Sequence, residues 1–138
     1  MPEISINYLA VLVCGVVHMI LGALWYSQLL FGKLWMKAMG KTDEELKEMN
    51  KGVWKAYLFS FIGALVMAFV LAHIIDYAQA DSIIGGLQGG FWVWLGFVIT
   101  TSMAGILFEG RPKGLYFIYN GYQLVSLLIM GMILAVWV

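Results

Sequence analysis

Cysteine, proline and charge are all scarce in this chain of 138 residues. It has one cysteine, Cys14, and two prolines, and charged residues make up 12% of it. One cysteine excludes an intramolecular disulfide and a metal or redox site of the CxxC type. The few lysines and arginines form no basic tail, so we expect no nucleic acid among its partners.

The motifs of familiar catalytic sites are also missing. No P-loop, HExxH pair, Ser-His-Asp order or cysteine cluster occurs in the sequence. The run from Gly85 to Gly90 is rich in glycine, but it lacks the Lys-Ser/Thr pair that completes a phosphate-binding loop. We therefore expect no catalytic residue, no cofactor and no metal, and an enzyme ranks third among the functions considered.

Hydrophobic residues, in contrast, make up 62% of the chain and form four long runs. Each run is long enough to supply the ~20 residues that a helix needs to cross a hydrocarbon core. The first run is longer than the core of a signal peptide, so we expect it to be retained as a helix. The sequence predicts an all-α membrane protein, a four-helix transmembrane bundle forming one domain, residues 1–138. The expected spans are residues 5–31, 54–75, 83–108 and 115–138, with a cytoplasmic helical loop at 32–53.

The lysines and arginines are sorted along the chain. All eight lie between Lys33 and Lys55 or in the turn with Arg111 and Lys113, and alternating spans put both segments on one side of the membrane. The positive-inside rule makes that side cytoplasmic. We predict a multi-pass protein of the cell inner membrane with both termini extracytoplasmic.

The loop between the first two runs is itself amphipathic. Lys33 and Lys37 share a helical face while Trp35 and Met39 face elsewhere, as in a short helix that lies on an anionic leaflet. A glycine then breaks this helix. The capping box Thr42–Glu45 predicts the start of a second short helix that leads into the next span.

Small residues recur at helix-packing intervals in two of the expected spans. Ser60, Ala64, Ala68 and Ala72 are spaced by four, and the run from Gly85 to Gly90 contains two overlapping GxxxG pairs. In a bilayer, such faces let two helix backbones approach closely. Because they exceed what one thin bundle obviously uses, we expect both faces to bind transmembrane helices of a second subunit, either another copy of the chain or a partner protein.

The two histidines lie at different depths. His18 is ~20 Å from the outer end of the first span, near the midplane, whereas His73 is within a turn of the outer end of the second. This difference argues against a haem held between them in one subunit and leaves open a site made from the same histidine in two subunits. His73 with Asp76 supplies too few ligands for a metal. His18 is the midplane polar candidate, and a hydrogen bond to a neighbouring helix is favoured over a proton or ligand role.

Six polar residues gather in the predicted cytoplasmic half of the bundle: Tyr26, Ser102, Glu109, Arg111, Asn120 and Gln123. Asn120 and Gln123 share a helical face at i,i+3. Polar side chains inside a bilayer are energetically costly, so two amides there indicate a structural or functional role. One alternative is interhelical hydrogen bonds, each of ~0.6 to 2 kcal/mol, that fix the helix register. The other is a polar pocket between helices, with Glu109 and Arg111 paired at its rim.

Four motifs resemble those of a known family. They are Gly22-Ala23-Leu24-Trp25-Tyr26-Ser27, Phe31-Gly32-Lys33-Leu34-Trp35-Met36, Leu107-Phe108-Glu109-Gly110-Arg111-Pro112, and Asn120-Gly121-Tyr122-Gln123-Leu124-Val125-Ser126 with Met130-Gly131. The chain resembles a family of small bacterial four-span integral membrane proteins catalogued as a domain of unknown function. This chain has Gln28 where that family commonly has proline. The resemblance implies a fold and a topology, but no activity.

Two functions of different classes follow. The leading one is a non-enzymatic small integral membrane protein that acts through helix–helix association, as a homo-oligomer or an accessory subunit, with lipid and other membrane proteins as partners. The alternative is a small transporter or ligand-binding membrane protein that uses the polar pocket. Small dimeric multidrug exporters typically keep a carboxylate deep in the first span, whereas this chain has no acid there after Glu3.

Overall fold

The computed structural model describes residues 3–137, and every regular element within that range is helical. In chain order these are α1 (Tyr8–Trp25), α2 (Gly32–Met39), α3 (Asp43–Met49), α4 (Val53–Tyr77), α5 (Ile83–Val93), the π-helical turn η1 (Trp94–Ile99), α6 (Thr100–Leu107) and α7 (Lys113–Val136). Helix α5, η1 and α6 form one continuous helix, so four helices are long and apolar enough to cross a membrane. The predicted all-α fold with four membrane-spanning helices is confirmed.

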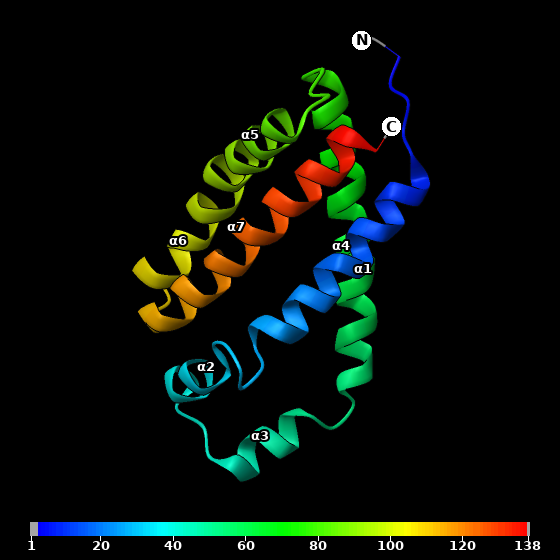
Figure 1. The fold of residues 1–138 in the computed structure, drawn as a ribbon. Coiled ribbons are helices and arrows are strands. Elements are labelled where there is room, and N and C mark those ends of the chain that lie inside the picture. The colour runs from blue at the N-terminus through cyan, green and yellow to red at the C-terminus, as the bar shows by residue number, and fades with distance from the viewer. Residues whose placement is uncertain (1–2, 138) are drawn as a thin grey trace.

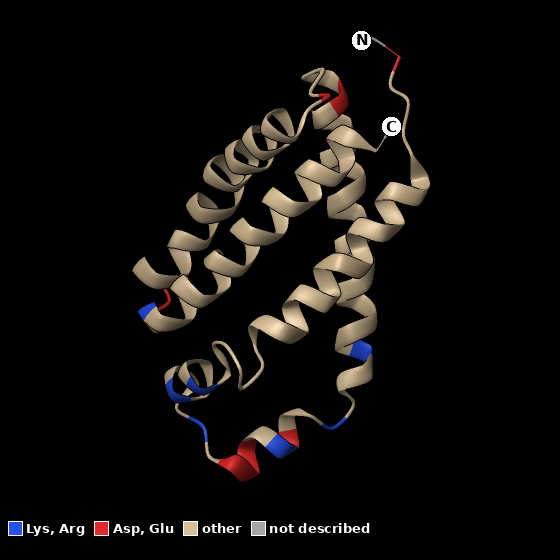
Figure 2. Cartoon of the chain, viewed as in Figure 1, with Lys and Arg blue, Asp and Glu red and all other residues tan. Residues whose placement is uncertain are grey.

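The four long helices form two pairs, and α7 of one pair also contacts both helices of the other. Helix α7 runs beside the continuous α5–α6 helix, and α1 crosses α4 on the other side (Figure 1). Both termini and the α4–α5 turn lie at one end of the bundle, and α2, α3 and the α6–α7 turn lie at the other (Figure 1). Every lysine and arginine lies toward this second end, which we call the basic end (Figure 2). The charges are therefore sorted in space as they are in the sequence.

The first span is shorter than expected. Helix α1 ends at Trp25, six residues before the predicted end at Phe31, and residues 26–31 form turns. The hydroxyl of Ser27 donates to the carbonyl of Leu24 at 2.6 Å, and the N–H of Gly32 donates back to the carbonyl of Ser27 at 2.8 Å. A serine hydroxyl that bonds its own backbone competes with helix continuation. The chain turns here without proline at Gln28, and the turn directs α2 toward the other helices. At the far end of the chain, α7 ends at Val136, and the predicted end of the last span at Val138 lies outside the described residues.

Side-chain caps begin three of the helices where the sequence places cap residues. Asn7 accepts from the N–H of Ala10 at 3.1 Å, and Ser82 accepts from the N–H of Gly85 at 3.0 Å. Thr42 accepts from the N–H of Glu45 at 3.2 Å, which confirms the predicted start of α3. Each bond satisfies a backbone donor that the first helical turn leaves free.

The glycine face packs inside the chain, which corrects the prediction that it binds a second subunit. A Cβ atom added at Gly86 would lie 2.3 Å from the carbonyl oxygen of Gly131, and one added at Gly90 would lie 2.3 Å from that of Leu127. Both oxygens belong to the backbone of α7. The three glycines therefore allow α5 and α7 to cross backbone to backbone, as small residues do in membrane helix pairs. The sequence predicted the close approach correctly but assigned it to another partner.

The alanine face of α4 is also largely used within the chain. Ala64, Ala68 and Ala72 are buried, whereas Ser60, one turn earlier, is exposed. Helix α1 packs along α4, where its Gly15 lies against the side chain of Leu65. Both small-residue faces thus hold this one bundle together.

Candidate functional site

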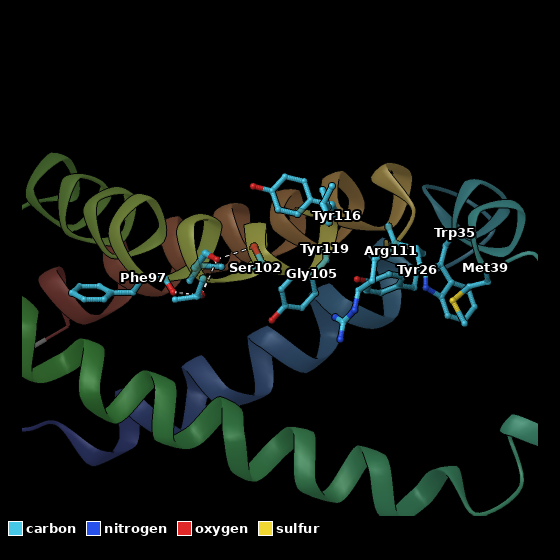
Figure 3. A pocket seen from close by; sticks show the side chains of 13 residues that line it. Tyr26, Trp35, Met39, Phe97, Ser102, Gly105, Arg111, Tyr116 and Tyr119 are labelled. Atoms are coloured by element: carbon cyan, nitrogen blue, oxygen red, sulfur yellow. Dashed lines mark hydrogen bonds between the residues drawn. The ribbon is translucent and has the colours of Figure 1, made fainter. Parts of the chain in front are cut away.

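A cavity of about 530 Å³ opens at the basic end, between the end of α1, α2, the η1–α6 region and the start of α7. A volume of ~300–1,000 Å³ is typical of small-molecule sites. Figure 3 shows the side chains that line it, with Trp35 and Met39 on α2 at one side and Phe97 on η1 at the other. The walls are mostly apolar and aromatic, with a few polar groups among them. This combination is the usual composition of a ligand site.

The π-helical turn η1 forms one wall of the cavity. A π turn widens the helix, and such turns are frequent at functional sites. Hydroxyls of two threonines donate to backbone carbonyls of this turn: Thr100 to Gly96 at 2.7 Å, and Thr101 to Phe97 at 2.6 Å. The hydroxyl of Tyr116 on α7 donates to the carbonyl of Ile99 at 3.2 Å. These bonds hold the side chains of Thr101 and Tyr116 against η1, where both form part of the cavity wall.

Asn120 lies behind this wall and joins α6 to α7. Its Oδ1 accepts from the hydroxyl of Ser102 at 3.0 Å, and its Nδ2 donates to the carbonyl of Tyr116 at 2.9 Å. Its own carbonyl accepts from the indole N–H of Trp94 at 2.9 Å. Asn120 is only 3% exposed and does not line the cavity itself. It therefore holds Ser102, which does line the cavity, in place.

Glu109 and Arg111 form the ion pair that the sequence predicted at the rim. Their nearest oxygen and nitrogen are 2.8 Å apart. Arg111 lines the cavity, whereas Glu109 pairs with it from outside the lining. In Figure 3, Arg111 and Tyr119 both point away from the α6–α7 hairpin on the side where Tyr26 lies. Of the six predicted site residues, the cavity lining therefore contains Tyr26, Ser102 and Arg111.

Gln123 lies apart from the cavity. It is 5% exposed, and its Oε1 is buried with no hydrogen-bond partner among the described residues. The expected face shared with Asn120 is present, because both side chains are buried on α7. Only Asn120, however, meets a polar group on the neighbouring helix.

His18 belongs to a second polar cluster in the centre of the bundle. Its Nδ1 lies 2.5 Å from the hydroxyl of Ser126 on α7, and its backbone carbonyl accepts from the hydroxyl of Tyr122 at 2.7 Å. The rings of His18 and Tyr122 are tilted, with centroids 4.9 Å apart. The favoured interpretation, a histidine bonded to a neighbouring helix, agrees with this geometry.

The predicted site residues include three of the thirteen residues that line the cavity, so sequence reasoning missed most of its wall. The missed residues that matter most to its shape are Trp35, Met39, Phe97, Tyr116 and Tyr119. A partial signal existed, since the lysines of α2 share a face and leave Trp35 and Met39 for another one. Nothing in the sequence, however, indicated that α2 folds back against α7.

The α1 and α7 motifs quoted for the family resemblance contact one another in the fold. A Cβ atom added at Gly22 would lie 2.8 Å from the hydroxyl of Tyr122, and one added at Gly121 would lie 3.1 Å from the ring of Trp25. Comparison with curated proteins and with solved structures finds no match to the chain. A family model does match, over residues 9–135, which include both motifs and the whole cavity. The chain thus belongs to the family described as protein of unknown function (DUF1761).

Proposed function

We propose that this small membrane protein is a non-enzymatic ligand-binding protein whose site is the cavity at the basic end. The observation that carries the proposal is the cavity itself, with its volume of about 530 Å³ and its mixed lining. Aromatic walls provide apolar contact area, and Ser102, Tyr26 and Arg111 supply a few polar groups that can orient a ligand. This is the second of the two functions expected from the sequence, now favoured over the first.

Self-association loses its main support because the glycine face is filled by α7. The exposed side chains of the α5–α6 helix, such as Trp92 and Phe97, are apolar residues on a helix that is long enough to span a membrane. Contact with lipid is sufficient to explain them. The proposal therefore needs no second copy of the chain.

Filling the cavity tests the proposal. Thr101→Trp adds a large ring at a lining position, whereas Thr100→Trp adds the same ring at the neighbouring residue outside the lining. Both threonines are exposed and donate to a carbonyl four residues earlier, so the two variants lose the same kind of bond. We expect a cavity ligand to stabilise the wild type and Thr100→Trp by ~2.7 kcal/mol at a hundredfold excess over its dissociation constant.

The same ligand should not stabilise Thr101→Trp. The measurement is thermal unfolding in nanodiscs with four probes that share one tail: dodecanoate, monododecyl phosphate, dodecanol and dodecyltrimethylammonium. If none of the four distinguishes the wild type from Thr101→Trp, the cavity is not a site for amphiphiles and the proposal fails.

We also propose that the basic end faces the cytoplasm of a cell whose inner membrane holds the protein. The support is the gathering of all lysines and arginines at that end (Figure 2). Single cysteines at Lys47 and at Gln79, in a Cys14→Ser background, lie on α3 and in the α4–α5 turn, at opposite ends of the bundle. In intact cells, an impermeant maleimide should label Gln79→Cys and leave Lys47→Cys unlabelled. The opposite labelling would place the cavity on the outer side.

A further inference from the structure

We infer that the cavity takes an amphiphile with one anionic head group, a carboxylate or a phosphate, that pairs with Arg111 while an apolar tail leaves toward the bilayer. The inference rests on the proposed function of the cavity and adds the class of ligand. It depends on the charge of the lining, on the surroundings of Arg111 and on the apolar wall.

The charge of the lining has one sign. Of the described residues that form the wall, Arg111 is the only one with a charged side chain, and no carboxylate is among them. A cationic ligand could be attracted only by aromatic rings such as those of Tyr26 and Trp35, and the guanidinium of Arg111 would repel it. Cation–π contacts at open sites contribute little, ~0.5–1 kcal/mol each. An anionic ligand finds its counter-charge in the wall.

The backbone and stem of Arg111 are held at the end of α6. Its backbone N–H donates to the carbonyl of Gly105 at 3.1 Å. Its Cδ lies 3.2 Å from the point where a Cβ of Gly105 would be, so the glycine lets the arginine stem lie against the helix. The stem therefore lies along α6 beside the cavity, with the guanidinium within reach of both the cavity and the solvent. The planar guanidinium suits the two oxygens of a carboxylate or phosphate.

Glu109 is a partner that a ligand can replace. The pair is short, at 2.8 Å, but the two side chains are 57% and 67% exposed. Exposed ion pairs are worth only about 0 to 1 kcal/mol, because water screens both charges. An anionic head on the cavity side can therefore take the place of Glu109 at little cost.

The start of α7 adds a positive field on the same side. Leu115 and Tyr116, in its first turn, line the cavity. This turn contains no acidic residue, and its cap residue, Pro112, makes no side-chain hydrogen bond. The helix macrodipole is positive at this end, which favours an anion near Arg111 by a further fraction of a kcal/mol.

The rest of the wall fits an apolar tail. Phe97, Val98 and Ile106 line the cavity along the η1–α6 helix, and Phe97 is 69% exposed on the outside of the bundle. In a membrane, that exposed surface meets hydrocarbon. A tail that begins at Arg111 can thus pass along this wall into the acyl chains, because the hydroxyls of Thr101 and Ser102 on the way are bonded to backbone carbonyls.

The test compares Arg111→Gln with a control, Lys113→Gln. Both variants remove one positive charge, but Lys113 lies two residues further along the chain and does not line the cavity. Binding of the four dodecyl probes is measured in phosphatidylcholine nanodiscs, with the signal of Thr101→Trp subtracted as partitioning into lipid. We expect dodecanoate and monododecyl phosphate to bind the wild type, and Arg111→Gln to weaken both by up to about fivefold, the effect of one exposed ion pair. Lys113→Gln should bind as the wild type does, and Glu109→Gln should bind at least as tightly.

The outcomes separate the inference from the proposed function. If dodecanol binds as well as the anions and Arg111→Gln changes nothing, the cavity remains a ligand site but its anion preference is wrong. Preference for dodecyltrimethylammonium would also overturn the inference. Replacing part of the phosphatidylcholine with phosphatidylglycerol distinguishes the source: competition with dodecanoate indicates that a membrane phospholipid is the occupant, and the absence of competition indicates a free single-chain anion.

Discussion

Gly90→Ala should destabilise the folded bundle by roughly 3 kcal/mol, the upper part of the usual range for overpacking. The new Cβ would lie 2.3 Å from the backbone oxygen of Leu127, far inside van der Waals contact. A backbone atom cannot rotate away as the end of a side chain can. Helices α5 and α7 must therefore separate, and their separation weakens the most extensive helix contact of the bundle.

A glycine in open surroundings provides the control. A Cβ at Gly63 on α4 meets nothing within 4 Å, so Gly63→Ala should leave stability unchanged or raise it slightly through helix propensity. Equilibrium unfolding in mild detergent, followed by circular dichroism, measures both variants. Gly131→Ala, whose Cβ would meet the carbonyl of Gly86 on the facing helix, should reproduce the loss. Equal stability of Gly90→Ala and Gly63→Ala would mean that α5 and α7 do not cross at this point.

Gln123→Met and Asn120→Leu should change stability in opposite directions, although both replace a buried amide on α7. Oε1 of Gln123 has no hydrogen-bond partner within residues 3–137, and a buried polar atom without a hydrogen bond costs ~1–3 kcal/mol. Met has a similar shape and no such atom, so Gln123→Met should stabilise the protein by about 1 kcal/mol or more. Asn120→Leu removes the bond to Ser102 on the neighbouring helix and the bond to Tyr116 within α7. It should destabilise the protein by about 1–2 kcal/mol, since interhelical bonds in membranes average ~0.6 kcal/mol and other intramolecular hydrogen bonds contribute ~0.5–1.5 kcal/mol.

The same unfolding assay measures the stability of both amide variants. A further variant, Ser102→Ala, tests whether Asn120 acts through Ser102. Ser102→Ala removes the partner of Asn120 Oδ1, so the effects of Ser102→Ala and Asn120→Leu should not add in the double variant. A loss of stability in Gln123→Met would contradict the prediction, because it would mean that Oε1 has a partner in the membrane.

The sequence by itself determined which segments are helices and where most of them start. Long apolar runs cannot remain in water, and in lipid their backbone groups must bond internally, so the spans follow from composition alone. Cap residues such as Thr42 and Ser82 bond to a backbone N–H three residues later, so the helix starts that they mark can be predicted from a short stretch of sequence. The position of the lysines at one end of the bundle likewise follows from the order of the spans.

Only the tertiary structure decided which surfaces meet. A GxxxG pattern specifies a face that permits close approach but does not name its partner, and here the partner is Gly131 on α7 of the same chain. In the same way, i,i+3 spacing put Asn120 and Gln123 on one face, but only Asn120 lies opposite a hydroxyl, that of Ser102. The cavity depends on two further features without a local signal, the π turn at Trp94–Ile99 and the return of α2 to α7. Periodicity is a property of one helix, whereas partners and cavities arise from contacts between segments far apart in the chain, so the sequence supplied the candidate residues and packing selected among them.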